Sequence, residues 1–193
     1  MATPRSLQII RDEHASLAAM LRAMHMLVER GPGAGPKNFF DVVRAMLFYI
    51  DEYPERLHHP KESNLLFPKV VKAAPKVLGA VDRLERDHMY SEKAARDLQH
   101  LLLAWELLGP SYREAFVTAL SKYIDFYVGH MTLEEEVILP EAERALGASD
   151  WAEIDAAFAQ NADPLTGQYP PPAEYERLFS LIVQRAPAPI GLG

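Results

Sequence analysis

The chain has 193 residues, no cysteine and a formal net charge of −7 at pH 7. Its composition, 49% hydrophobic and 24% charged, is that of a globular protein and excludes a disordered one. The negative charge disfavours nucleic acid and anionic membrane surfaces as partners, because both are recognised by clustered lysine and arginine. The absence of cysteine excludes disulfides, thiolate zinc sites and iron–sulfur clusters. Any metal site must therefore use histidine and carboxylate.

No segment approaches the roughly 20 consecutive apolar residues that cross a bilayer. The first residues, MATPRSLQIIRDEH, lack the basic-then-apolar layout of a signal peptide. We therefore expect a cytoplasmic protein that binds neither membranes nor nucleic acid.

Four long segments carry apolar residues at the three- and four-residue steps of an amphipathic helix. They run from about Ser6 to Arg30, Asn38 to Ala73, Lys76 to Leu108 and Ser111 to Leu146. Breaks rich in glycine or proline separate them, RGPGAGPKN, AAP and GPS. Towards the ends of the second and fourth segments, the pattern places Leu65 and Val137 on the inward face. Because no strand-like alternation occurs, the predicted fold class is all-α, an up-down-up-down antiparallel four-helix bundle.

We expect the bundle to comprise residues 1–147 and a C-terminal helical extension to comprise residues 148–193. The extension has a short apolar helix over Trp151 to Phe158, a Pro-rich crossing and a last amphipathic helix from about Glu174 to Arg185. These pieces either pack on the bundle or form a homodimer contact. The sequence leaves both roles open.

Each predicted bundle helix has a histidine at a position where the pattern requires an inward-facing apolar residue. The four are His14, His58, His88 and His130. Counted from the adjoining turns, neighbouring histidines differ in level by about one helical turn or less, at 1.5 Å per residue. A lone inward histidine is usually an ordinary core residue, but four at one level favour a common site.

Glutamates follow two of these histidines by one helical turn, Glu62 after His58 and Glu134 after His130. Side chains four residues apart share a helix face, so each pair can present an imidazole and a carboxylate to one point. Burying carboxylates in a core costs several kcal/mol each unless a cation neutralises them. The two halves of the chain repeat this arrangement, which predicts a two-metal site with both glutamates as bridges.

Several polar residues near these helices have weaker claims. His25 and His100 lie off the common layer and are left out of the site. Glu92 is an open candidate for a further ligand. Tyr123 and Tyr127 share the inward face of the fourth helix, where they either donate hydrogen bonds to a bound oxygen species or pack with satisfied hydroxyls.

The stretch HHPKE, residues 58–62, places two histidines side by side, although adjacent residues of a regular helix diverge by about 100°. Pro60 removes one backbone hydrogen bond, and its ring crowds the carbonyl of Arg56. A kink or π-bulge there would widen the inward face and add His59 as a fifth histidine. In the alternative, His59 points outward. In the first arrangement, one metal is bound by His14 and His58. The other metal is bound by His59, His88 and His130, and the two metals share both glutamates.

The ordered motifs RDEH, HHPKE followed by LLFP, LERDH and HMTLEEEVILP resemble the hemerythrin-like, HHE cation-binding domain family over about residues 5–146. The later stretch AFAQNADPL is similar to an extension seen in such proteins. The resemblance implies a four-helix bundle holding two iron ions as an oxo- or hydroxo-bridged di-iron centre. It makes Glu62 and Glu134 the bridges and His14, His58, His88 and His130 terminal ligands. Nitrogen and oxygen donors suit iron, and manganese or zinc are substitutes that ligand softness also admits.

Two positions depart from the oxygen-carrying hemerythrins. Their third helix has a second histidine where this chain has Glu92, and their fourth-helix carboxylate is a later aspartate. These departures argue against reversible O₂ carriage. We expect a metal-binding protein that binds or senses O₂, NO or peroxide. The alternatives are a peroxide- or NO-consuming oxidoreductase, an iron donor for cluster repair, and a structural metal site.

Overall fold

The computed structural model describes residues 3–193, and its regular elements are all helical, which confirms the all-α prediction. The α-helices are α1 Arg5–Arg30, α2 Pro36–Ile50, α3 His59–Lys61, α4 Phe67–Ala73, α5 Leu78–Leu108, α6 Arg113–Leu133, α7 Leu139–Ala145, α8 Ala148–Phe158 and α9 Glu176–Arg185. Three π-helical segments are η1 Asp51–His58, η2 Glu62–Leu66 and η5 Glu134–Ile138. Three short 3₁₀ turns are η3 Pro75–Val77, η4 Pro110–Tyr112 and η6 Pro164–Thr166.

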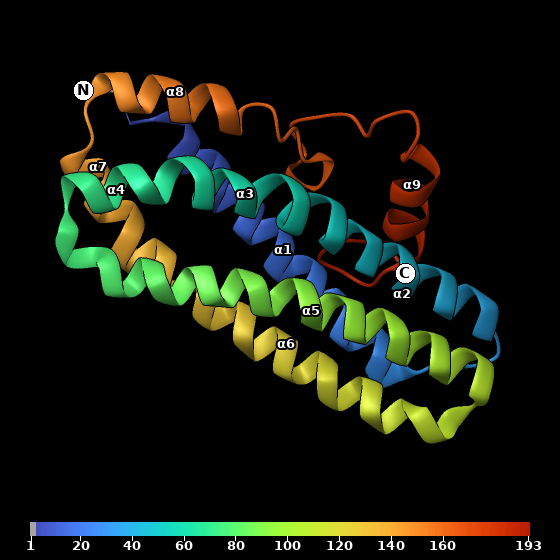
Figure 1. Cartoon of the computed structure of the whole chain (residues 1–193). Helices are drawn as coiled ribbons and strands as arrows, with labels where there is room; N and C mark the ends of the chain where they lie inside the picture. The colour runs from blue at the N-terminus through green and yellow to red at the C-terminus, as the bar shows by residue number, and fades with distance from the viewer. Residues whose placement is uncertain (1–2) are drawn as a thin grey trace.

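The elements of residues 5–145 join into four long rods (Figure 1). One rod is α1, the second runs without a break from α2 to α4, the third is α5, and the fourth runs from α6 to α7. Both α1 and α5 contact α2 and α6, so the four rods enclose a common interior. Within residues 3–193, no helix has both the length and the apolar character needed to cross a bilayer.

Apolar side chains fill the interior on both sides of one polar layer. One cluster includes Met46, Leu98 and Leu120, and the other includes Ile10 and Leu84. On the first three rods, the buried histidines and glutamates fall in sequence between the residues of the two clusters, and on the fourth rod Met131 of the first cluster lies between His130 and Glu134. The polar layer is therefore held in place by apolar packing above and below it.

The extension packs on the rods. Helix α8 contacts α1, and α9 contacts α2 (Figure 1). Trp151 and Phe158 of α8 join one apolar cluster, while Phe179 and Ile182 of α9 join the other. The extension therefore covers part of the surface of the rods.

Each π-helical segment ends two residues before a proline. The prolines are Pro60, Pro68 and Pro140. A proline ring crowds the carbonyl four residues earlier, and that carbonyl lies within the π-helical segment in every case. An extra residue per turn relieves the crowding. The distortion predicted at Pro60 is confirmed. The prolines of LLFP and VILP account in the same way for the π-helical segments η2 and η5.

The extra residue also rotates the inward face by one position. Leu65 and Val137, predicted inward from a regular helical period, are only partly buried. Their neighbours Leu66 and Ile138 are fully buried instead. A regular period fails beyond a π-helical segment because the helix there has more residues per turn than the pattern assumes.

Candidate metal centre

The seven side chains predicted for the metal site meet in the polar layer, in two groups. The first group is His14, His58, Glu62 and Glu134, and the second group is His59, Glu62, His88 and His130. Within each group, one potential ligand atom per residue lies within 4.8 Å of the others, and every member is buried. Glu62 belongs to both groups. The structure therefore places all seven residues together.

The carboxylate of Glu62 lies between the two groups. Its Oε1 is 2.6 Å from His58 Nε2 in the first group, and its Oε2 is 3.2 Å from His88 Nε2 in the second. One oxygen thus faces each group, which is the arrangement of a bridging carboxylate. The partition of the histidines between the groups is the one predicted from HHPKE.

Glu134 departs from the prediction that both glutamates are shared, because it belongs to the first group only. Its Oε2 lies 3.3 Å from His14 Nε2 on α1. One turn earlier on the same rod, His130 faces α5, where its Nδ1 is 3.7 Å from Asp87. His130 at the end of α6 and Glu134 at the start of η5 therefore point to different neighbouring rods.

His58 and His59 both point into the interior, with 4% and 6% of their surfaces exposed. The π-helical segment η1 ends at His58, and its wider turn accommodates the second imidazole on the inward side. The ring of His59 stacks on that of His88, with centroids 4.0 Å apart. The outward alternative for His59 is therefore wrong.

Every histidine of the two groups has a polar neighbour at Nδ1. The pairs are His14 with Glu135 at 2.8 Å, His58 with Glu13 at 2.6 Å, His59 with Glu55 at 3.2 Å, His88 with Ser63 at 3.0 Å and His130 with Asp87 at 3.7 Å. A ring that donates from Nδ1 keeps a lone pair on Nε2 for a cation. The same partners restrict rotation of the rings.

Glu55 also accounts for the two inward tyrosines. Tyr127 donates to Glu55 Oε1 at 2.7 Å and Tyr123 donates to the same oxygen at 3.4 Å. Ser91 donates to Glu55 Oε2 at 3.0 Å. Both phenols therefore have a protein acceptor, and they pack with satisfied hydroxyls. Glu55 lies four residues before His59, the same spacing that separates His58 from Glu62. This spacing is visible in the sequence and could have identified Glu55.

Eight buried polar atoms of the centre have no hydrogen-bond partner within residues 3–193. They are His58 Nε2, His88 Nε2, both ring nitrogens of His130 and both carboxylate oxygens of Glu62 and Glu134. Such atoms are rare because each one costs desolvation energy. Two ligands that each lie about 2.1 Å from one ion, at right angles, are about 3 Å apart. The short contacts around Glu62 and Glu134 have this spacing without hydrogen-bond geometry, so the donor set fits metal ions.

Burial and neighbouring charges shift the pKa values of the carboxyl and imidazole groups of the centre. Burial, and then the charge of Glu62, raise the pKa of Glu134 to about 7. Burial alone would raise the pKa of Glu62 too, but His58 outweighs it and holds the pKa well below its ordinary value. Burial lowers the pKa of His59 to about 4 and lowers the pKa of His130 as well. These two imidazoles are therefore neutral at physiological pH, as ligands must be.

The weaker candidates lie elsewhere. Glu92 is 57% exposed and pairs with Arg96 on the surface of α5, so it does not join either group. His25 is 43% exposed beside Glu29, and His100 is exposed. Leaving both histidines out of the site agrees with their positions.

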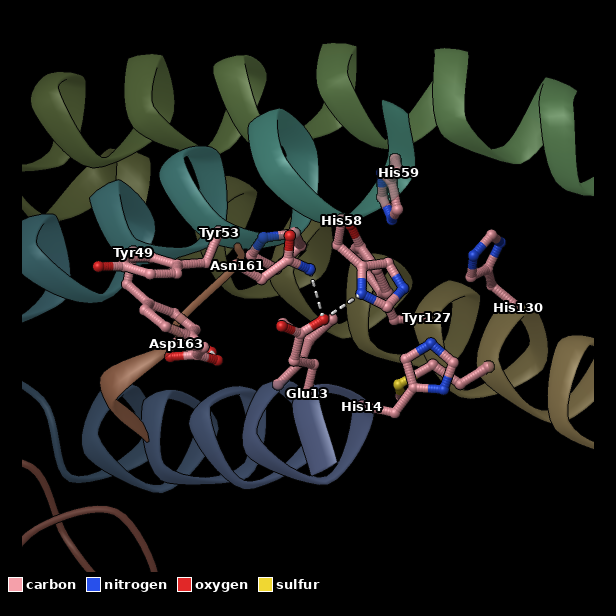
Figure 2. Close-up of a pocket in the computed structure, with 13 residues that line it drawn as sticks. Glu13, His14, Tyr49, Tyr53, His58, His59, Tyr127, His130, Asn161 and Asp163 are labelled. Carbon is pink, nitrogen blue, oxygen red and sulfur yellow. Dashed lines mark hydrogen bonds and ion pairs between the residues drawn. The ribbon is translucent and has the colours of Figure 1, made fainter. Parts of the chain in front are cut away.

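A cavity of about 20 Å³ adjoins the two groups, enough for one water-sized molecule (Figure 2). Imidazoles of both groups line one side of it. The other side carries polar residues that the sequence pattern does not identify, among them Glu13, Tyr49, Asn161 and Asp163. The last two come from the extension, at least 100 residues away from their hydrogen-bond partners on the rods, so no local spacing could reveal them.

Comparison with protein families finds one matching model, the hemerythrin HHE cation binding domain, over residues 5–142. That stretch is well over half of the chain and contains all seven residues of the two groups. Neither the curated proteins nor the solved structures contain a significant match.

Proposed function

Since the chain belongs to the hemerythrin HHE cation-binding domain family, we propose that it is a non-haem di-iron protein that binds or senses O₂, NO or peroxide. The observation that carries the proposal is the position of Glu62, a fully buried carboxylate whose two oxygens face two separate ligand groups. A structural zinc site needs only one closed tetrahedral set, whereas this centre has two sets joined by a carboxylate.

The proposal includes the topology of the bundle. We infer an up-down-up-down antiparallel arrangement from the short connections between successive rods and from the contacts of α1 and α5 with both α2 and α6. This arrangement brings the middles of all four rods to one level. It supports a centre built from one or two side chains of each rod.

In the proposed centre, His14, His58 and Glu134 hold one iron, and His59, His88 and His130 hold the other. Glu62 is shared. Bound iron supplies one-electron redox chemistry and an open position for a small molecule. The chain itself sets which molecule can reach that position, because the adjoining cavity has room for only a water-sized ligand. This size favours a diatomic molecule or peroxide over an organic substrate.

Spectral titration of the Fe²⁺-loaded protein tests this function. We expect its visible absorption to change saturably on addition of NO, O₂ or hydrogen peroxide, and the Glu62→Ala variant to show no such change. Steady consumption of peroxide or NO, with many turnovers per chain, would instead favour the oxidoreductase. A loaded protein that responds to none of the three ligands would refute the proposal.

A further inference from the structure

The extension enters the metal centre through residues 161–163. Asn161 and Asp163 are 4% and 2% exposed, although the segment connects two helices that lie on the outside of the rods. Between them, Ala162 has φ 47°, in the left-handed region that residues other than glycine rarely adopt. This backbone conformation accompanies two neighbouring side chains that both point inward (Figure 2).

Asn161 is connected to a histidine of the first group through one carboxylate. Its Nδ2 donates to Glu13 Oε2 at 2.9 Å, and the same oxygen accepts a hydrogen bond from His58 Nδ1 at 2.6 Å (Figure 2). Lys61 Nζ donates to Asn161 Oδ1 and so holds the amide in this orientation. The four side chains form a continuous relay from Lys61 to His58.

Asp163 fixes the segment at a second point. Its Oδ2 accepts a hydrogen bond from the hydroxyl of Tyr49 at 2.7 Å, and its Oδ1 accepts one from the backbone N–H of Leu165 at 2.9 Å. Tyr49 is fully buried on α2. The segment is therefore anchored to the second rod independently of Asn161, and removal of the amide alone should leave it in place.

We propose that Asn161 is a positioning residue for the metal of the first group, contributed by the extension from outside the stretch that matches the family. It holds Glu13, and Glu13 orients His58 so that its Nε2 faces the metal. The inference rests on the proposed function, namely that the first group holds a metal.

The second group should not depend on Asn161. Its histidines have other neighbours at Nδ1: His59 and His88 bond to Glu55 and Ser63, and His130 lies 3.7 Å from Asp87. None of these three side chains hydrogen-bonds to Asn161. The expected effect of a change at this residue is therefore selective for one of two metals.

Two variants separate the hydrogen bond from packing. Asn161→Asp keeps the size of the side chain but replaces the donor with an oxygen facing Glu13. Asn161→Ala removes the amide. Asn64→Ala is the matched control, since Asn64 is exposed and its side chain donates to the backbone carbonyl of Pro60 on the same rod. Each is combined with His88→Ala, which leaves only the first group complete, and with His14→Ala, which leaves only the second.

Anaerobic calorimetric titration with Fe²⁺ is the readout, together with the melting temperature of the metal-free protein. In the His88→Ala background we expect Asn161→Asp to weaken Fe²⁺ binding about 10-fold, the lower end of the range for direct partners of metal-bound histidines, because Asn161 acts on His58 through Glu13. In the His14→Ala background we expect no change. Asn64→Ala should match its parent in both.

Unchanged affinity of Asn161→Asp in the His88→Ala background would overturn the inference and leave the di-iron proposal intact. Equal losses in both backgrounds, with a lower metal-free melting temperature, would show a merely structural role and would also overturn it. If the unaltered chain takes up no Fe²⁺, the metal centre itself fails, and the inference fails with it.

Discussion

Replacing Glu134 with glutamine should stabilise the metal-free protein while removing metal from the first group. Glu134 is fully buried, and burial together with Glu62 raises its pKa from 4.5 to about 7. An acid whose pKa is raised by folding destabilises the fold as pH rises above 4.5, and the cost is complete above about pH 7. At pH 8 this cost is about 3 kcal/mol, at 1.36 kcal/mol per pKa unit.

The attraction between Glu134 and His14 also raises the pKa of the histidine. Burial alone would lower the pKa of His14, but Glu134 and Glu135 outweigh it and raise the pKa from 6.5 to about 9. A histidine whose pKa is raised by folding stabilises the fold fully below pH 6.5 and loses this effect as pH rises through 9. At pH 8 the remaining contribution is about 1 kcal/mol. Because the pKa of Glu134 already contains this attraction, it is not subtracted again, and the expected gain for Glu134→Gln stays at about 3 kcal/mol.

Urea unfolding of chelator-treated protein at pH 8 measures this gain as a higher midpoint at unchanged slope. The control is Glu135→Gln. Its carboxylate is 38% exposed, and its hydrogen bond to His14 lowers its pKa, so this substitution should destabilise the metal-free protein slightly. A metal-free Glu134→Gln protein less stable than the unaltered chain, or one that still binds two metals, would refute the reasoning.

Three further outcomes follow from the geometry. Metal analysis should show that Glu62→Ala loses most of both metals, whereas His25→Ala and His100→Ala retain both. Two metals per chain in Glu62→Ala would show that Glu62 does not bridge them. His59→Ala should lose the metal of the second group only, so a variant that keeps two metals would show that His59 is not a ligand. Binding at the first group should release protons and strengthen from pH 7 to 9, because His14 must lose its proton. Calorimetry in buffers of different ionisation enthalpy measures this release, and pH-independent binding to the first group would contradict it.

Local periodicity reveals most of the centre because its histidines and glutamates occupy inward positions of long helices. The side-by-side histidines also carry a local signal, since the proline that follows them widens the turn and directs both inward. Beyond each widened turn the regular period is out of step, and so Leu65 and Val137 are predicted inward in place of Leu66 and Ile138.

The partners of the histidines are harder to predict, because several of them come from distant parts of the chain. Glu13 lies 45 residues from His58, and Asn161 lies 148 residues from Glu13. No spacing rule joins positions on different rods, or a loop to a rod. Their contacts depend on how the helices pack, which only the folded structure shows. The placement of Glu134 in one group has the same origin.

Metal analysis of the freshly purified chain, combined with its visible absorption in air, tests the central claim most directly. We predict two iron ions per chain and a visible spectrum that changes on reduction. A colourless protein with one zinc per chain, or one that remains empty after incubation with Fe²⁺, would contradict a shared di-iron centre at Glu62.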